Sequence, residues 1–185
     1  MNRRSAVLTL VVTAVLGVAA CTNSTTGNGT PAPPTNTSQP GNSSPTGSPG
    51  LASIQPCDLL SANDLSQNQL GSPTPENVGG ARTCRWLNTT ANNGDGYSIG
   101  VGIRESQGIN TASTDTDTVT PDNIGNHPGR QLQSTISGTC VIAIGVTNSS
   151  RVDVTVNAGT DPIQGCQLAN QFAKLVEPNL PPASS

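Results

Sequence analysis

The sequence contains few aromatic and few basic residues. Trp86, Tyr97 and Phe172 are its only aromatic residues, and Lys and Arg together account for 8 of 185 residues. A folded domain of this composition must build its core from Val, Ile, Leu and Ala, and we expect cross-links to support that core. The basic residues are scattered, whereas nucleic-acid-binding proteins gather them into a patch or stripe. We therefore expect no nucleic-acid partner.

The sequence also lacks an apolar run long enough for a mature transmembrane helix. Its longest such run, residues 6–20, follows Arg3 and Arg4 and is interrupted only by two threonines and a glycine. A helix needs about 20 apolar residues to cross a bilayer, and no stop-transfer charges follow this run. A basic start, a short apolar stretch and small residues at its end are typical of a secretory signal peptide.

The end of the run, Val18-Ala19-Ala20-Cys21, resembles the bacterial lipobox, in which the cysteine thiol is lipidated before cleavage. We expect residues 1–20 to be a lipoprotein signal peptide and Cys21 to be the lipidated mature N-terminus. Two or three acyl chains, such as palmitate, on one cysteine hold a protein durably on a membrane. The sequence thus predicts a lipoprotein on the outer face of the cytoplasmic membrane, in the cell envelope. The alternative is an ordinary secretory peptide with an incidental cysteine.

Residues 22–50 carry no charged and no aromatic side chain and consist almost wholly of Thr, Ser, Asn, Gly and Pro. Such a composition cannot bury enough apolar surface to fold. We expect residues 21–50 to be the lipidated cysteine and a disordered tether, and residues 51–185 to form a single disulfide-braced domain. Without residues 1–20 the chain keeps six basic and all eleven acidic residues, a formal charge of −5. An anionic lipid surface is therefore not expected to attract the domain itself.

Four cysteines lie within this domain: Cys57, Cys84, Cys140 and Cys166. An even count in an exported chain indicates two disulfides, whereas a zinc site would need short ligand spacings such as CxxC, which are missing. Four cysteines allow three pairings, and the sequence alone does not select one. We prefer Cys57 with Cys84 and Cys140 with Cys166, because each pair would join a helix-proximal cysteine to a cysteine on the inward face of a strand.

The hydrophobic pattern predicts an α+β domain: an antiparallel sheet of about five strands packed against a C-terminal helix and a short N-terminal helix, with two disulfides. Asp161 as N-cap, Pro162 in the first turn and Pro178 after the end delimit the C-terminal helix. Residues 71–81 and 105–129 are rich in turn formers and are expected to be loops, the second with a short helix. The predicted strands are 83–88, 97–104, 131–136, 140–146 and 152–156, and the predicted helices are 62–69 and 162–177.

No motif in the sequence indicates catalysis, a metal or a cofactor. His127 is the only histidine, and no GxSxG elbow or paired-carboxylate motif accompanies it, so we expect it in a loop. Asp115, Asp117 and Asp122 lie in a Thr-rich segment but do not fit the EF-hand pattern, which needs Gly at position six and Glu at position twelve. We therefore interpret that segment as a solvated acidic loop.

Four short motifs occur in an order that resembles a known family. They are Pro-Cys-Asp-Leu-Leu at 56–60, Cys-Arg-Trp at 84–86, the strand cysteine at 140 and the helix cysteine at 166. The chain from about 51 to 181, behind a lipobox and a tether, resembles the actinobacterial lipoprotein family called domain of unknown function 3558. The resemblance implies an envelope lipoprotein of undetermined activity, and it transfers no catalytic residues.

These observations favour a non-enzymatic binding or accessory module, held on the membrane by lipid on Cys21. We expect a monomer that binds an envelope ligand or partner protein. Function in small exported domains tends to lie on loops, so residues 71–81 and 105–130 are the expected binding surface. The alternative is an envelope hydrolase in which the fold brings His127 close to a serine and an acid.

Replacing Cys21 by Ala is expected to abolish lipid labelling and to leave the precursor uncleaved, because the thiol accepts the acyl group. Metabolic labelling with a tagged palmitate and the electrophoretic mobility of the precursor measure the two effects. Normal labelling and maturation of Cys21→Ala would contradict the lipobox assignment.

Overall fold

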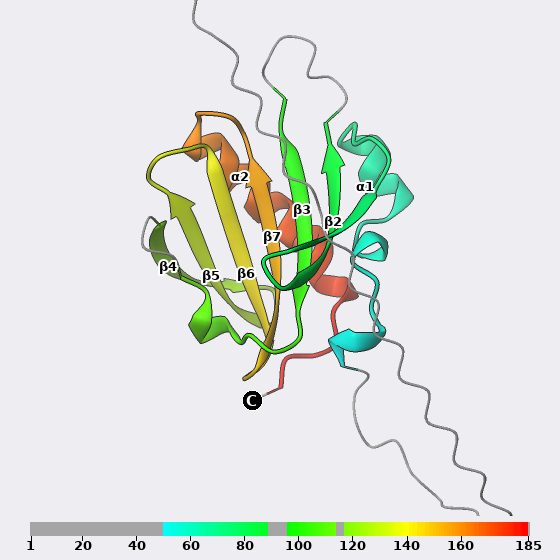
Figure 1. The fold of residues 1–185 in the computed structure, drawn as a ribbon, viewed down its shortest axis with the longest axis vertical. Coiled ribbons are helices and arrows are strands. Elements are labelled where there is room, and N and C mark those ends of the chain that lie inside the picture. The colour runs from blue at the N-terminus through cyan, green and yellow to red at the C-terminus, as the bar shows by residue number, and fades with distance from the viewer. Residues whose placement is uncertain (1–49, 89–95, 114–116, 185) are drawn as a thin grey trace, which may run out of the picture. The chain divides into compact units, whose positions relative to one another are not determined.

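A computed structural model describes residues 50–88, 96–113 and 117–184 (Figure 1). The expected signal peptide, Cys21 and the tether lie outside these described residues, as do residues 89–95 and 114–116. The strands are β1 (Thr74–Val78), β2 (Ala81–Leu87), β3 (Ser98–Arg104), β4 (Asp117–Ile124), β5 (His127–Ser134), β6 (Thr139–Thr147) and β7 (Ser150–Asn157). The α-helices are α1 (Ala62–Gln67) and α2 (Pro162–Val176), and the 3₁₀ turns are η1 (Leu51–Ser53), η2 (Pro56–Leu59), η3 (Ile109–Thr111) and η4 (Glu177–Asn179).

The strands form one antiparallel sheet of seven, in the order β1-β2-β3-β7-β6-β5-β4. All five predicted strands are present, but the expected number was too low because β1 and β4 lie in segments predicted to be loops. Each of these two strands is at an outer edge of the sheet and contains a proline, Pro75 or Pro121. Proline is tolerated in an edge strand because one side of its backbone has no neighbouring strand to which an N–H must donate. The short helix expected in the second loop is the 3₁₀ turn η3.

Side chains alternate between the two faces of the sheet along each central strand, and the two faces differ in what covers them. Helix α2 packs against β6 and β7, and the Val and Ile side chains of β3, β6 and β7, other than Val141, point toward this side. Their relative exposure is 3% or less. In Figure 1, α2 lies behind the sheet. The core therefore lies between the sheet and the helical layer, and no α-helix of the described residues lies on the other face, which is called the open face below.

The N-terminal segment completes the helical layer beside α2. Ser61 and Asp64 form a capping box at the start of α1, since the Ser61 N–H donates to Oδ2 of Asp64 at 2.9 Å and the Asp64 N–H donates to Oγ of Ser61 at 3.2 Å. At the other end of α1, Nε2 of Gln171 in α2 donates to Oδ1 of Asn68 at 2.9 Å. The predicted short helix thus lies near the C-terminal helix. Within the described ranges, neither helix has the length and apolarity to span a bilayer.

Both disulfides of the preferred pairing are present. One joins Cys57 in η2 to Cys84 in β2, and the other joins Cys140 in β6 to Cys166 in α2. Each cross-link ties a segment of the helical layer to the face of the sheet that it covers. The periodicity argument placed the strand cysteines inward, and the structure confirms this, because Cys84 and Cys140 are fully buried.

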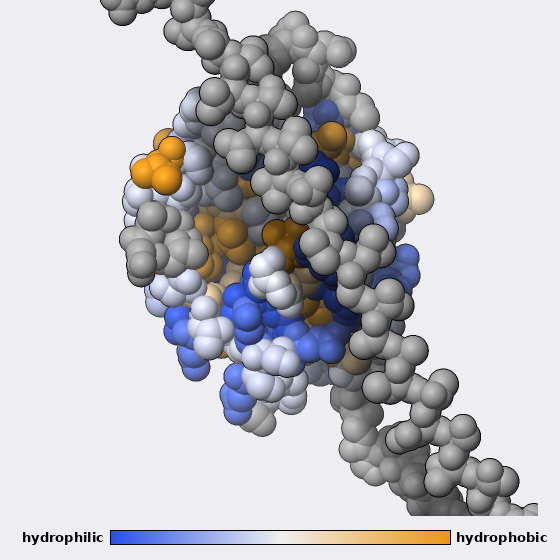
Figure 2. Space-filling model, viewed as in Figure 1, coloured by the Kyte–Doolittle hydropathy of each residue, from blue (hydrophilic) through white to orange (hydrophobic). Residues whose placement is uncertain are grey.

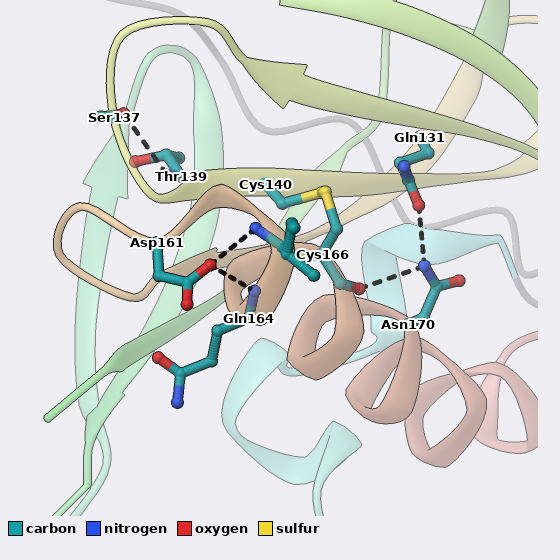
Figure 3. Close-up of a disulfide and its surroundings, with 9 residues drawn as sticks. Gln131, Ser137, Thr139, Cys140, Asp161, Gln164, Cys166 and Asn170 are labelled. Carbon is teal, nitrogen blue, oxygen red and sulfur yellow. Dashed lines mark hydrogen bonds between the residues drawn. A yellow bond between two sulfur atoms is a disulfide. The ribbon is translucent and has the colours of Figure 1, made fainter. Parts of the chain in front are cut away.

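The first turns of α2 pack tightly against the turn between β5 and β6. Asp161 caps the helix by accepting hydrogen bonds from the backbone N–H groups of Ile163 and Gln164, both at 3.0 Å. Figure 3 shows this cap close to the disulfide of Cys166. Gly165 approaches the carbonyl of Gly138 so closely that a Cβ atom at Gly165 would overlap that oxygen. Close backbone approach therefore requires glycine at this helical position.

Gly165→Ala is expected to destabilise the protein, although the same change in an exposed helix stabilises it by about 0.5–1 kcal/mol. We expect the free energy of unfolding to fall by about 1–3 kcal/mol, because the added methyl group displaces the β5–β6 turn. The exposed Gln167→Ala on the same helix is the matched control and should change it by less than about 0.5 kcal/mol. Urea unfolding followed by the fluorescence of the buried Trp86 measures both. A stabilised Gly165→Ala variant would contradict the tight packing.

Candidate functional site

The open face carries a groove of about 430 Å³. Its floor consists of residues that pair across neighbouring strands, in two rows two residues apart along each strand. The first row, from β5 to β2, is Leu132, Val141, Thr155, Gly100 and Arg85. The second row, from β7 to β1, is Asp153, Gly102, Thr83 and Glu76.

The groove is hollow at its centre because β3 has no side chains there. Gly100 and Gly102 face the groove, while the residues between and beside them are buried on the helical side. A Cβ atom on Gly100 would lie 3.7 Å from Cγ2 of Thr83 and 4.0 Å from Cβ of Thr155, which are ordinary contact distances. A larger side chain at Gly100 would therefore fit the backbone and occupy the groove.

Two segments from opposite sides of the sheet form the walls. Residues 105–113, called the strap below, cross the open face, and Ile109 and Ala112 of the strap pack with Leu132 and Val141. On the other side, β1 and the start of β2 contribute Val78 and other lining residues. Figure 2, which looks onto the open face, shows apolar residues in its middle beside strongly hydrophilic ones. Both segments expected to form the binding surface, 71–81 and 105–130, therefore line the groove.

One end of the groove holds a cluster of three charged residues. Asp153 of β7 lies between two guanidinium groups: Nε of Arg151 donates to its Oδ1 at 2.7 Å, and Nε of Arg104 donates to its Oδ2 at 2.5 Å. The Arg151 and Asp153 side chains are 7% and 10% exposed, respectively. Charge-assisted hydrogen bonds of this kind are strong, and here they compensate the burial of all three charges.

The two arginines also position the walls. Nη1 of Arg151 donates to the carbonyl of Gly108 at 2.9 Å and to Oγ1 of Thr111 at 2.8 Å, which fixes the strap over the sheet. Nη1 of Arg104 donates to the carbonyl of Gly79 at 2.6 Å, which fixes the turn between β1 and β2. The cluster therefore determines the width of the groove at this end.

His127 lies away from the groove and is not in a loop. It begins β5, is 4% exposed and points to the helical side, so the expectation of a loop position was wrong. Its Nδ1 lies 2.8 Å from Oε1 of Glu177, and its Nε2 lies 2.8 Å from the carbonyl oxygen of Pro181. Both ring nitrogens are therefore engaged in contacts within the fold. The ring joins the end of α2 and the C-terminal segment to the sheet.

Glu177 is held as a carboxylate by these contacts. The backbone N–H of Asn126 donates to its Oε1 at 3.0 Å, and His127 binds the same oxygen. The hydrogen bond from Asn126, followed by the one from His127, lowers the pKa of the Glu177 carboxyl below its ordinary value of 4.5, although partial burial opposes the shift. This pair is thus a structural brace.

The structure does not gather the other residues weighed as metal ligands. Asp115 and the side chain of Asp117 lie outside the described part, and the half-buried Asp122 accepts a hydrogen bond from the backbone N–H of Asn123. Among the described residues, no group of three or more His, Cys, Asp or Glu side chains is placed to hold a metal ion. The four domain cysteines are all used in disulfides.

Sequence reasoning missed the residues that define the groove. Arg104, Arg151 and Asp153 each occupy a polar position in an alternating strand, where a charged residue is expected to be solvated. The signal that marks them is the cross-strand register, which places Arg104 opposite Arg151 and Asp153 two pairs further along the same two strands. That register becomes visible only when β3 and β7 are known to be neighbours.

Glu177→Gln is expected to lower the free energy of unfolding by about 1–2 kcal/mol near neutral pH, because it weakens the hydrogen bonds with Asn126 and His127. The folded-state pKa of Glu177 is lowered, so this stabilisation is fully present above pH 4.5 and is lost as the pH falls through the lowered value. Urea unfolding at a series of pH values should show the difference between the wild type and the variant shrink in acid. A difference independent of pH would contradict the brace. The single variant His127→Gln and the double variant with Glu177→Gln measure the coupling free energy between the two side chains.

A family model described as "Protein of unknown function (DUF3558)" matches residues 16–179. The matched range begins just before Val18, includes the whole sheet and both disulfides, and ends in η4. No curated protein and no solved structure matches the chain. Because the match covers most of the sequence, the chain belongs to the family of proteins of unknown function DUF3558.

Proposed function

We propose that this protein is a membrane-anchored envelope lipoprotein whose folded domain is a non-enzymatic binding module. Its ligand occupies the groove on the open face of the sheet. The single observation that carries the proposal is the groove itself, a hollow of about 430 Å³ with a glycine floor, two walls and a charged end. Small-molecule sites have volumes of about 300–1,000 Å³ and combine apolar linings with a few placed polar groups.

Two observations support the envelope location. The disulfides of Cys57 with Cys84 and of Cys140 with Cys166 are typical of proteins that fold outside the cytoplasm. The family match begins at residue 16, so the stretch that resembles a lipobox, residues 18–21, lies within the region shared with the family. Lipid on Cys21 would then place the groove in the envelope, outside the cytoplasmic membrane.

The geometry of His127 does not favour the hydrolase alternative. Its two nitrogens face Glu177 and Pro181, no described serine is hydrogen-bonded to it, and it does not line the groove. A general base needs a free nitrogen within about 2.6–3.2 Å of the proton that it removes. We therefore assign the histidine a structural role.

A photo-reactive amino acid tests the binding role when it is placed in the full chain in its native envelope. Val78 at the rim of the groove and Leu87 outside it are a matched pair, since they are 52% and 54% exposed on neighbouring strands. We expect a reproducible cross-linked species from position 78 and none from position 87. A second substitution, Gly100→Leu, should prevent the cross-link, because the new side chain fills the groove.

The outcome that would contradict the proposal is equal capture at both positions, or capture at position 78 that survives Gly100→Leu. Hydrolysis of an envelope ester or glycan that His127→Gln abolishes, while the fold persists, would favour the enzyme instead. The unfolding midpoint of Gly100→Leu must stay near that of the wild type, which Trp86 fluorescence reports.

A further inference from the structure

The charges that line the groove do not cancel. Three arginines and two carboxylates line it, which leaves a formal charge of +1: Arg85, Arg104, Arg151, Glu76 and Asp153. The whole chain has a formal charge of −3. A cavity that is positive in an otherwise acidic protein attracts an anionic group, because its low-dielectric walls strengthen the local potential.

Arg104 carries a donor nitrogen that no described residue uses. Its Nε is bonded to Asp153, and its Nη1 is bonded to Gly79 and to Oε1 of Gln107 at 3.1 Å. Its Nη2 has no hydrogen-bond partner among the described residues, although the side chain is only 20% exposed. A guanidinium fixed by three partners is pre-organised, and a carboxylate placed beside Nη2 would form a charge-assisted hydrogen bond.

Much of the remaining lining is apolar. The apolar side chains that line the groove are Val78, Ala81, Ala112, Leu132 and Val141. Thr83 and Thr155 add methyl groups between them, and Gly100 and Gly102 leave the centre clear. The volume of about 430 Å³ is at the low end of the range for small-molecule sites, which suits one narrow chain rather than a two-chain lipid.

We propose that the groove binds a single-chain amphiphilic acid of the fatty-acid type. Its carboxylate pairs with Nη2 of Arg104, and its chain lies over Gly102 and Gly100 against Leu132 and Val141. This inference rests on the proposed function, because it names the ligand class of the same groove. The chain's own 22–50 segment does not fit this chemistry, since it has neither an anionic group nor a continuous apolar stretch.

Photo-reactive, alkyne-tagged probes test the ligand class in membranes isolated from cells that make the full chain. Three probes share one alkyl chain and end in a carboxylate, a primary amide or an amine. We expect the carboxylate to label peptides that contain Val141, Thr155 or Gly100. The amide and the amine should label them about tenfold less, because they lose the charge-assisted hydrogen bond.

Two variants assign the labelling to the groove. Arg104→Gln removes the charge and should lower labelling by the carboxylate probe about tenfold, without the same loss for the amide probe. Lys174→Gln removes an equal charge from the exposed side of α2 and is the matched control, with no loss expected. Gly100→Leu should abolish labelling by every probe. Gly100→Leu still shows whether the probes bind in the groove if Arg104→Gln disturbs the fold.

The outcomes separate this inference from the proposed function. Equal labelling by the carboxylate and the amide, or unchanged labelling of Arg104→Gln, would overturn the inference. Failure of all three probes, together with capture of another species through position 78, would overturn it and leave the binding module standing. Failure of both the probes and position 78 would overturn both.

Discussion

A helix of fifteen residues has to cover a sheet of seven strands, and the rest of the structure follows from this constraint. Helix α2 reaches β5, β6 and β7, and the N-terminal segment around η2 extends the same layer over β2 and β3. Most apolar side chains of the central strands point into this layer, while Leu132, Val141 and Ala143 lie on the other face. The other face carries glycine and charge, and the groove forms there because, within the described ranges, the strap and no α-helix covers it.

The central part of the fold was predictable because each element there has a complete local signal. The alternation of apolar and polar residues in β3, β6 and β7 placed these strands, and Asp161, Pro162 and Pro178 placed α2. The same patterns placed Cys140 and Cys166 on the inward faces of their elements. The edge strands gave no such signal. Pro75 and Pro121 are read as loop residues in isolation, and only the position of their strands at the rim makes them compatible with a sheet.

The candidate site was predictable only at its walls. The turn-rich segments 71–81 and 105–130 marked the two sides, but the charged cluster of Arg104, Arg151 and Asp153 depends on register between strands that are distant in sequence. His127 shows the opposite error. Its Gly and Pro neighbours suggest a loop, while burial and the contact with Glu177 depend on the end of α2, fifty residues later.

The prolines at both rims of the sheet have a further effect. An exposed outer strand offers a row of unpaired backbone groups to any similar chain that comes near, and proline removes one donor from that row while its ring stands in the way. Pro75 and Pro121 interrupt the two outer strands. Copies of the domain that lie close together on one surface would therefore have no uninterrupted edge strand with which to pair. The edges of the sheet can then be exposed to solvent without starting aggregation.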